Sequence, residues 1–336
     1  MKLIERKKAF IILGKKLKNL ASDEIFLEKI FFKNRWFIKK FVKFSLKNIA
    51  NILNEKNINK FLEPYIHMEK NKISKTVGLV LAGNIPMVGF HDLFTVLISG
   101  NKVNLKLSSK DDILIKKIID ILIMVKPEFK NYIKIENSHL KNFDGIIATG
   151  SNNTSRYFES YFRKYKNIIR KNRISFAILN GMESSEDIQN LGKDIFTYFG
   201  LGCRNVSKIF IPRNFNFSFL LENFKNFEFV KDHNKYKNNY DYNKAIFLLN
   251  NISHFDNGFV LLKEDKSFFS PISTIFYEFY DNLENLEFNL QFRKEEIQCV
   301  VGSSLKLKNV NFGETQKPNL WDFADNIDTL EWNYKL

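Results

Sequence analysis

Two patterns of hydrophobic and polar positions divide the chain near residue 70. Before that point, apolar residues recur at helical spacing with lysines between them, most clearly in residues 35–53. Ser22 and Asp23 are candidate helix caps, and Glu24 follows in the first turn of the next helix. The pattern predicts a helical N-terminal segment, residues 1–70, which we expect to pack on a core rather than lie on a membrane surface.

After Ser74 the pattern changes to short apolar runs that alternate with amphipathic stretches. Strands are predicted at residues 76–82, 102–107, 132–136, 145–149, 174–179, 206–211 and 271–280. Helices are predicted at residues 90–98, 111–125, 153–162, 186–199 and 214–226, and loops with short strands at 233–257. This alternation is typical of α/β proteins with an open, mostly parallel sheet that carries helices on both faces. The sequence has no internal repeat and no Gly/Ser linker, so we expect two interleaved lobes.

The length and composition fit such a fold and exclude several classes of protein. With 336 residues, 44% of them hydrophobic, the chain can bury a sizeable core in one large or two moderate domains. No apolar run reaches the ~18 residues of a membrane span, and the basic residues 1–16 fit the start of a helix better than a secretion signal. Cys203 and Cys299 lie too far apart for a disulfide framework or a metal-binding knuckle. We therefore expect a reduced, cytoplasmic protein without a membrane span or a metal site.

The net charge of +15 and the pI near 9.5 raise the question of a nucleic-acid partner. The lysines, however, are spread along the whole chain and do not form one block interleaved with aromatic residues. Abundant Lys, Asn, Ile and Phe beside only 14 Gly and 6 Pro is the composition expected from an AT-rich genome. We expect no nucleic-acid partner, and a non-enzymatic basic binding protein is kept as an alternative of a different class.

The first candidate site is the glycine-flanked cysteine in residues 200–205, Gly-Leu-Gly-Cys-Arg-Asn. It stands between a predicted helix and a predicted strand, where small neighbours leave room for a ligand to approach the sulfur of Cys203. Arg204 or a nearby peptide N–H would favour the thiolate that nucleophilic catalysis needs. Taken alone, the pattern also fits a small buried cysteine in a tight turn. Cys299 lies in an apolar strand pattern and is predicted to be a core residue.

The second candidate site is the turn after the strand at 76–82, where Asn84 stands two residues before Pro86. The proline favours an extended conformation for the residue before it, so we expect Asn84 to project from the carboxyl edge of the sheet, where ligands of such folds bind. A neutral side-chain amide there is suited to stabilising an oxyanion. An ordinary turn asparagine fits these residues equally well.

Two further strand ends carry residues suited to a ribose or a phosphate. Lys106 ends one strand, and Ser108 follows it closely. Gly150 and Ser151 lie between another strand and a helix, whose free N–H groups suit a pyrophosphate. Each signal is weak by itself, and neither a GxGxxG fingerprint nor a P-loop is present in the sequence.

Taken in order, these segments resemble the aldehyde dehydrogenase superfamily, and within it the bioluminescence-type, LuxC-like fatty acyl-CoA reductases. The resemblance runs from about residue 70 to the C-terminus and is carried by VGLVLAGNIP, SGNKVNLKLSS, IIATGS, FGLGCRNVSKIFIP, FFSPIS and the tail FGETQKPNLWDFADNIDTLEW. It implies an aldehyde-dehydrogenase-like fold. The dinucleotide-binding lobe would span residues 71–200, the catalytic lobe 201–300, and a C-terminal segment, 301–336, would return to the cofactor lobe.

The resemblance also implies the chemistry. It gives Cys203 the role of covalent nucleophile and Asn84 the role of oxyanion donor. It implies that the residues contacting the cofactor are Lys106, Ser108, Gly150, Ser151 and, on the nicotinamide side, Phe269. The implied reaction reduces an acyl-CoA, with a fatty acyl group, to the aldehyde through a thioester on Cys203, in an enzyme that could be a homo-oligomer. A reductase of an acyl phosphate or an acyl-AMP is the alternative within this fold.

Three positions depart from the aldehyde-oxidising members of that superfamily. Those members carry a glutamate that acts as general base in hydrolysing the thioester; here Ile178 is predicted to stand at that position, which suits reduction. Ser109 and Lys110 stand where a glutamate would repel a 2′-phosphate, so NADPH is expected, with NADH still possible. A glutamate that usually contacts the nicotinamide ribose is replaced near Ser267, so that role is not transferred.

Overall fold

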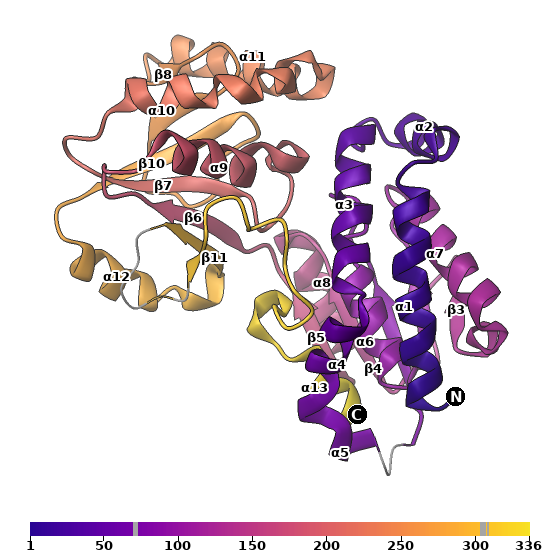
Figure 1. Ribbon diagram of the computed structural model, residues 1–336. Helices are drawn as coiled ribbons and strands as arrows, with labels where there is room; N and C mark the ends of the chain where they lie inside the picture. Colours follow the sequence, from indigo (N-terminus) through magenta and orange to yellow (C-terminus); the bar gives the residue numbers. More distant parts are fainter. Residues whose placement is uncertain (70–72, 303–306, 308) are drawn as a thin grey trace. The chain divides into compact units, whose positions relative to one another are not determined.

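The computed structural model describes residues 1–69, 73–302, 307 and 309–336. They form two compact units, which Figure 1 draws as ribbons. The first unit comprises Met1–Asn172 and Asn319–Leu336, and the second unit comprises Arg173–Pro318. Each unit contains a sheet of its own, as predicted for an α/β chain with two lobes. Within the described ranges, no helix is both long enough and apolar enough to cross a membrane.

The first unit is built on a parallel five-stranded sheet. Its strands are β1 (Thr76–Val80), β2 (Lys102–Lys106), β3 (Ile133–Ile135), β4 (Gly145–Thr149) and β5 (Lys166–Arg170), in the order β3-β2-β1-β4-β5. The chain moves from β1 to one side through β2 and β3, and then crosses to the other side for β4 and β5. Ligands of open α/β sheets bind at the carboxyl ends of the strands where this direction reverses, which here is between β1 and β4.

Helices surround this sheet, and the N-terminal ones share its core. They are α1 (Leu3–Leu20), α2 (Glu24–Lys33), α3 (Lys39–Ile52), α4 (Glu55–Leu62), α5 (Ile66–Glu69), α6 (Phe90–Ile98), α7 (Asp112–Val125), α8 (Asn152–Phe162) and α13 (Thr329–Tyr334). Phe10 of α1 meets Phe94 of α6 edge to face, with 4.8 Å between ring centroids, and both belong to the buried cluster that contains Leu79 of β1. The predicted packing of the N-terminal helices on the core is confirmed. Asp23 caps α2 by accepting the N–H of Phe26.

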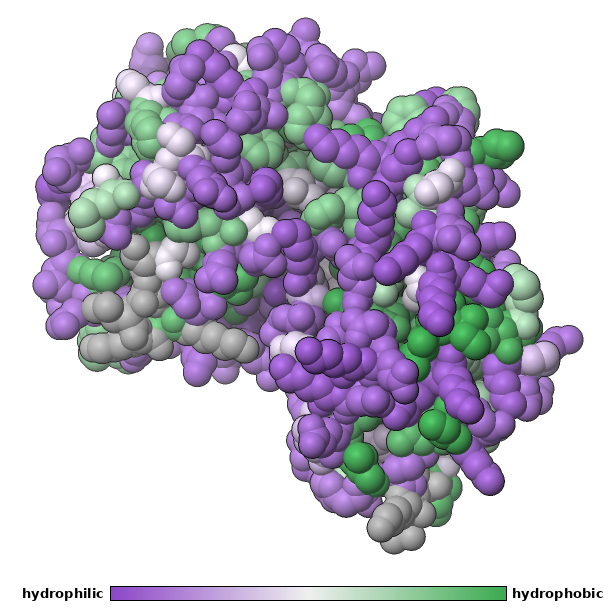
Figure 2. All heavy atoms as spheres, in the orientation of Figure 1, coloured by the Kyte–Doolittle hydropathy of each residue, from purple (hydrophilic) through white to green (hydrophobic). Residues whose placement is uncertain are grey.

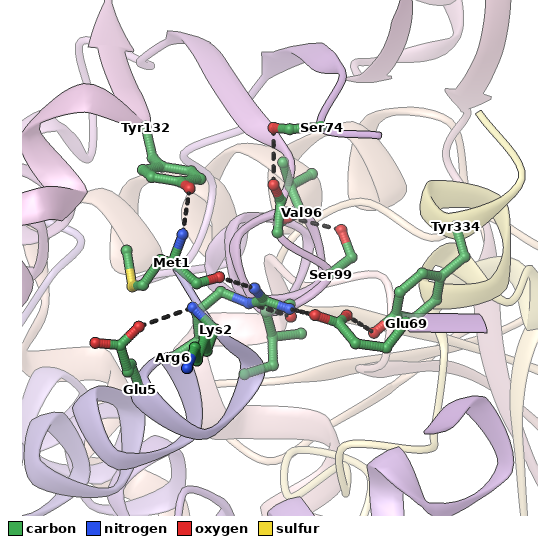
Figure 3. Close-up of polar contacts among 12 residues, drawn as sticks. Met1, Lys2, Glu5, Arg6, Glu69, Ser74, Val96, Ser99, Tyr132 and Tyr334 are labelled. Atoms are coloured by element: carbon green, nitrogen blue, oxygen red, sulfur yellow. Dashed lines mark hydrogen bonds and ion pairs between the residues drawn. The ribbon is translucent and has the colours of Figure 1, made fainter. Parts of the chain in front are cut away.

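A buried arginine ties α1, α5 and α13 together, as Figure 3 shows. Arg6 is only 3% exposed; its Nη2 donates to Glu69 Oε1 at 2.5 Å, and its Nε donates to the carbonyl of Ile98 at 2.9 Å. The hydroxyl of Tyr334 donates to the other oxygen of the Glu69 carboxylate at 3.0 Å. The last helix of the chain is therefore fastened within the first unit.

The C-terminal segment returns to the first unit only from Asn319 onward. His91 Nε2 lies 2.7 Å from the carbonyl oxygen of Leu320, and Arg170 Nη1 donates to the carbonyl of Ala324 at 2.7 Å. Before Asn319 the chain still belongs to the second unit, where β12 (Asn309–Val310) pairs with β11 (Ile297–Gly302). The predicted segment 301–336 is thus divided between the two units.

The second unit contains a larger sheet. Its strands are β6 (Ile174–Ile178), β7 (Val206–Pro212), β8 (Phe255–Asp256), β9 (Leu261–Glu264), β10 (Thr274–Tyr280), β11 and β12, in the order β12-β11-β6-β7-β10-β9-β8. Every pairing is parallel except that of β8 with β9. Its helices are α9 (Ser185–Phe196), α10 (Phe217–Asn223), α11 (Asn234–Leu249) and α12 (Leu283–Gln291). The units divide at residue 172 rather than at the predicted residue 200, because β6 pairs with β7 and β11 inside this sheet.

The prediction of loops and short strands at 233–257 is wrong. Most of that stretch is α11, a helix of 16 residues whose buried side chains are Tyr236, Tyr240, Asn243 and Phe247. These positions have helical spacing, but three of the four side chains carry polar groups, so the apolar periodicity is hidden. The predicted helix at 186–199 is shorter than expected, since α9 ends at Phe196.

Candidate active site

The turn that carries Asn84 is held rigidly against the first unit, while Asn84 itself is exposed. Met87, three residues further on, has a φ of +57°, a strained value for a side chain of its size, and its N–H is accepted by Asp111 Oδ2 at 2.7 Å. The hydroxyl of Ser45 donates to the carbonyl of Pro86 at 2.9 Å. The turn is therefore fixed by α3 on one side and by the residue before α7 on the other.

Asp111 is an unusual anchor for that turn. Its side chain is 5% exposed, and Oδ1 has no hydrogen-bond partner among the described residues. Burial raises the pKa of this carboxyl well above its usual range, and the hydrogen bond from Met87 opposes the shift only in part. No feature of the sequence around Asp111 indicated this contact except its place just before a helix.

The predicted cofactor residues of the first unit lie at the same edge of the sheet as Asn84. β1, β2 and β4 are parallel neighbours, so Lys106, Ser108, Gly150 and Ser151 all follow strands that end side by side. The close approach is visible at Gly83: a Cβ there would lie 2.7 Å from the Cβ of Ser108. The structure thus brings these five predicted residues to one edge.

Two of these positions suit a phosphate-bearing ligand in different ways. Ser151 is exposed and caps α8, its hydroxyl accepting the N–H of Thr154 at 3.3 Å, so that the amino end of an 11-residue helix faces the solvent there. Lys106 Nζ donates to the carbonyl of Asn137 at 2.5 Å. An ammonium has three donors, so that bond still leaves Lys106 able to meet an anion.

Cys203 of the second unit is an exposed thiol, whereas Cys299 is a buried one. Cys203 lies in the short connection between the end of α9 and β7, and its carbonyl accepts a hydrogen bond from Ser175 Oγ at 2.9 Å. The prediction of an accessible sulfur at Cys203, and of a core position for Cys299, is confirmed. Burial raises the pKa of the Cys299 thiol, and the nearby Arg204 guanidinium, 3.4 Å from its sulfur, opposes that shift. That Arg204, or a nearby peptide N–H, favours the Cys203 thiolate stays a prediction.

Phe269 lies at the same edge of the second sheet as Cys203, because both precede the amino ends of the neighbouring parallel strands β7 and β10. Phe269 as a whole residue is 46% exposed. Reciprocal hydrogen bonds fasten its loop to β7: Ser207 Oγ donates to the carbonyl of Phe268 at 3.2 Å, and Ser270 Oγ donates to the carbonyl of Ser207 at 2.9 Å. An exposed aromatic ring on a fixed loop is available to pack on a flat ligand.

A buried lysine beneath this loop was missed from the sequence. Lys208 is fully buried, and its Nζ donates to the carbonyl of Asp265 at 3.0 Å and to Glu278 Oε2 at 2.5 Å. Burial lowers the pKa of Lys208, and the Glu278 carboxylate opposes that shift. The signal was present in the sequence as one lysine inside the apolar strand at residues 206–211.

The prediction that Ile178 stands at the position of a general base beside Cys203 is wrong. Cys203 precedes the amino end of β7, and the residue of β6 that bonds to it is Ser175. Ile178 pairs with Phe210 near the opposite end of these strands and is fully buried in an apolar cluster. Since successive strand residues are ~3.3 Å apart, the three residues from 175 to 178 carry Ile178 about 10 Å along the strand.

The predicted site residues therefore form two groups, one in each unit. Asn84, Lys106, Ser108, Gly150 and Ser151 lie at the carboxyl edge of the first sheet. Cys203 and Phe269 lie at the amino edge of the second sheet.

The comparison with protein families identifies the chain. The family model described as acyl-CoA reductase (LuxC) matches residues 15–216, which is more than half of its length. The chain belongs to this family. The match covers both the Asn84 turn and the Cys203 loop of this LuxC-family protein. No curated protein matches it in sequence.

Solved structures show that the LuxC-family chain has the aldehyde dehydrogenase fold. Aldehyde dehydrogenase 21 from Physcomitrella patens, solved with its product succinate, is similar over 100% of this chain and 84% of its own, with a TM-score of 0.69 and 12% identity. An aldehyde dehydrogenase from Bacillus cereus in complex with NAD+ gives a TM-score of 0.62 at 12% identity, covering 90% of this chain and 72% of its own. The family and the fold together support an oxidoreductase.

One further similar structure contains the other nucleotide. Glyceraldehyde-3-phosphate dehydrogenase GapN from Methanocaldococcus jannaschii, in complex with NADP, gives a TM-score of 0.61 at 12% identity and covers 90% of this chain and 76% of its own. Structures of this fold thus contain NAD+ in one case and NADP in another.

Proposed function

We propose that this protein reduces an acyl-CoA, with a fatty acyl group, to the aldehyde, using Cys203 as the covalent nucleophile and NADPH as the source of reducing equivalents. The observation that carries the proposal is the exposed Cys203 thiol on a fixed loop, in a chain of the acyl-CoA reductase family. Thiol chemistry requires a reducing environment, so we also propose a cytoplasmic location.

The residues of the first unit fit a dinucleotide. The amino end of α8 at Ser151 suits a pyrophosphate, and Lys106 supplies a cation at the same sheet edge. Ser109 and Lys110 are both exposed and neither is acidic, which supports NADPH over NADH because a 2′-phosphate would meet a cation there. In the second unit, the exposed ring of Phe269 suits the nicotinamide side.

The mechanism begins with attack of the Cys203 thiolate on the thioester carbonyl. The side-chain amide of Asn84 donates to the developing oxyanion, CoA departs as its thiolate and takes up a proton, and the acyl group stays on Cys203 as a thioester. One thioester replaces another, so this exchange needs no strong base. A reduced nicotinamide bound beside Phe269 would supply a hydride for the acyl carbon. Collapse of the resulting tetrahedral centre breaks its bond to sulfur, releases the aldehyde and restores the Cys203 thiolate.

Acyl transfer to Cys203 can be tested without the reduction step. Protein incubated with radiolabelled acyl-CoA is expected to retain the label, and Cys203→Ala is expected to abolish the labelling while NADPH binding persists. Cys299→Ala is the matched control, because that thiol is buried, and it should label like the wild type. Labelling of Cys203→Ala at the wild-type level would show that the nucleophile is misassigned.

The oxyanion role and the substrate class are tested by turnover. Asn84→Ala is expected to lower the rate of NADPH-dependent acyl-CoA reduction by about a hundredfold or more. An unchanged rate would remove Asn84 from the oxyanion site. Acyl phosphate and acyl-AMP, offered in the same assay, decide between the proposed substrate and its alternatives: faster reduction of either would replace acyl-CoA in the proposal.

A further inference from the structure

The loop that presents Cys203 is strained. After α9 ends at Phe196, three successive residues, Tyr198, Phe199 and Gly200, have φ values of +57°, +57° and +75°. Glycine tolerates this region, but two aromatic residues do so only at a cost in free energy, which the surrounding structure must offset. Such strain is found most often where a loop must hold a functional group in a fixed place.

One buried carboxamide holds this loop. Asn205 is 3% exposed, and its Oδ1 accepts the N–H of Gly202 at 2.8 Å. Its Nδ2 donates to the carbonyls of Asp194 at 2.9 Å and Thr197 at 2.8 Å. These are carbonyls at the end of α9, where a helix leaves carbonyl groups without partners of its own.

The chemistry of that position calls for an amide. The N–H of Gly202 needs an acceptor, and the carbonyls at the end of α9 need donors. Asn205 meets both needs, so its side chain must offer an acceptor and donors together. The asparagine side chain has one acceptor oxygen and an amide nitrogen with two N–H donors, whereas an ionised aspartate can accept hydrogen bonds but cannot donate any. Asn205 stands two residues after Cys203, and it accepts the N–H of Gly202, the residue directly before Cys203.

We propose that Asn205 is a positioning residue that holds the Cys203 backbone in place for acyl transfer. It closes the Cys203 loop on the α9 side, and Ser175 Oγ holds the carbonyl of Cys203 on the other. Its catalytic importance depends on the proposed function, but its effect on the thiol can be measured without acyl-CoA.

The test measures the alkylation rate of Cys203 by iodoacetamide at pH 7.5, with the modified peptide followed by mass spectrometry. Asn205→Asp places a carboxylate against the α9 carbonyls, two residues from the sulfur, where it disfavours the thiolate. Alkylation of Cys203 is expected to slow at least fivefold. In steady-state assays with acyl-CoA and NADPH, kcat is expected to fall at least tenfold, with KM within threefold of the wild type.

Asn101→Asp is the matched control. Asn101 is a buried carboxamide of the first unit that bonds on both sides in the same way, accepting the N–H of Lys75 at 3.1 Å and donating to the carbonyl of Asn333 at 2.9 Å. The Asn101→Asp variant is expected to be less stable than the wild type, with no change in the alkylation rate of Cys203. A milder variant, Asn205→Ser, keeps one hydroxyl donor and acceptor, and it decides the matter if Asn205→Asp does not fold; its kcat is also expected to fall at least tenfold.

Two results would overturn the assignment: alkylation and kcat within twofold of the wild type in the folded Asn205 variants, or equal slowing in Asn101→Asp. If the wild-type protein does not reduce acyl-CoA, the proposed function fails. The role of Asn205 is then decided by the rate of Cys203 alkylation in its variants alone.

Discussion

Replacing Gly83 by alanine should force apart the two loops that carry the predicted oxyanion and cofactor residues. A Cβ at residue 83 would lie 2.4 Å from Ser108 Oγ and 2.7 Å from Ser108 Cβ. Both separations are far below the ~3.5 Å of an ordinary carbon contact, so one loop must move by roughly 1 Å. Overpacking of this kind costs about 1–3 kcal/mol of unfolding free energy.

The same movement should reduce activity. Asn84 is the next residue after Gly83, and a displacement of ~1 Å in a group that contacts the reacting atoms lowers rates by about a hundredfold. The assay pairs urea unfolding, which gives the loss of stability, with the rate of acyl-CoA reduction. An unchanged dependence of unfolding free energy on urea concentration would show that the substitution leaves the surface exposed on unfolding unaltered, so that the unfolding free energies can be compared directly.

Two substitutions at Ser108 separate the steric cause from others. Ser108→Ala removes only the Oγ contact and should recover part of the stability lost in Gly83→Ala, while Ser108→Gly removes the Cβ contact as well and should recover most of it. Each Ser108 variant is also measured alone, since an added glycine is itself destabilising by about 0.5–1 kcal/mol. If Gly83→Ala costs the same in the Ser108→Gly background as in the wild type, the steric reasoning is refuted.

Three other predictions concern buried charged groups. Arg170 is 4% exposed, and its Nη2 donates to Asp92 Oδ1 at 2.7 Å, so Arg170→Met should lower the unfolding free energy by about 3–5 kcal/mol; the double variant with Asp92→Leu should recover much of it in urea unfolding. Burial raises the pKa of Asp194 from 3.8 to about 6, although three donors from Gly313 and Thr315 oppose that shift. A carboxyl whose pKa is higher in the folded protein than in the unfolded chain stabilises the fold fully only below its unfolded pKa, and this contribution is lost as pH rises through its folded pKa. The stability of the wild type relative to Asp194→Ala should therefore be greater at pH 5 than at pH 7. An equal stability difference at the two pH values would contradict this sign. By the same reasoning, Asp111→Asn keeps an acceptor for the N–H of Met87 and removes a buried charge, so its stability relative to the wild type should increase as pH rises above about 4, as urea unfolding across that range will show.

The sequence predicted best those elements whose ends are marked by local chemistry. β4 occupies the predicted residues 145–149, and α6 the predicted residues 90–98, because Gly145 begins one apolar run and Gly100 follows the end of the other. The sequence prediction failed for α11, where the buried residues carry polar groups. It also missed β5 and α12 entirely. Periodicity of apolar residues detects apolar burial only.

The candidate site was predicted only in part, for a similar reason. Exposed residues on short turns, such as Asn84 and Cys203, stand out in the sequence because glycine or proline flanks them. The position of Ile178 relative to Cys203 depends on the register between β6 and β7, which the sequence alone did not indicate. Asp111 and Asn205 were missed because their importance lies in the distant backbone groups that they bond.

Asp111 and Asn205 meet the same physical need with opposite chemistry. Each holds a turn that contains at least one residue at positive φ, and each lies close to a proposed catalytic residue. At the Asn84 turn the unmatched group is a single N–H, so any buried acceptor suffices and a charge is a disadvantage. At the Cys203 loop the unmatched groups include carbonyls at a helix end, so donors are indispensable. The same exchange of amide and carboxylate should therefore be tolerated or stabilising at residue 111, and damaging at residue 205.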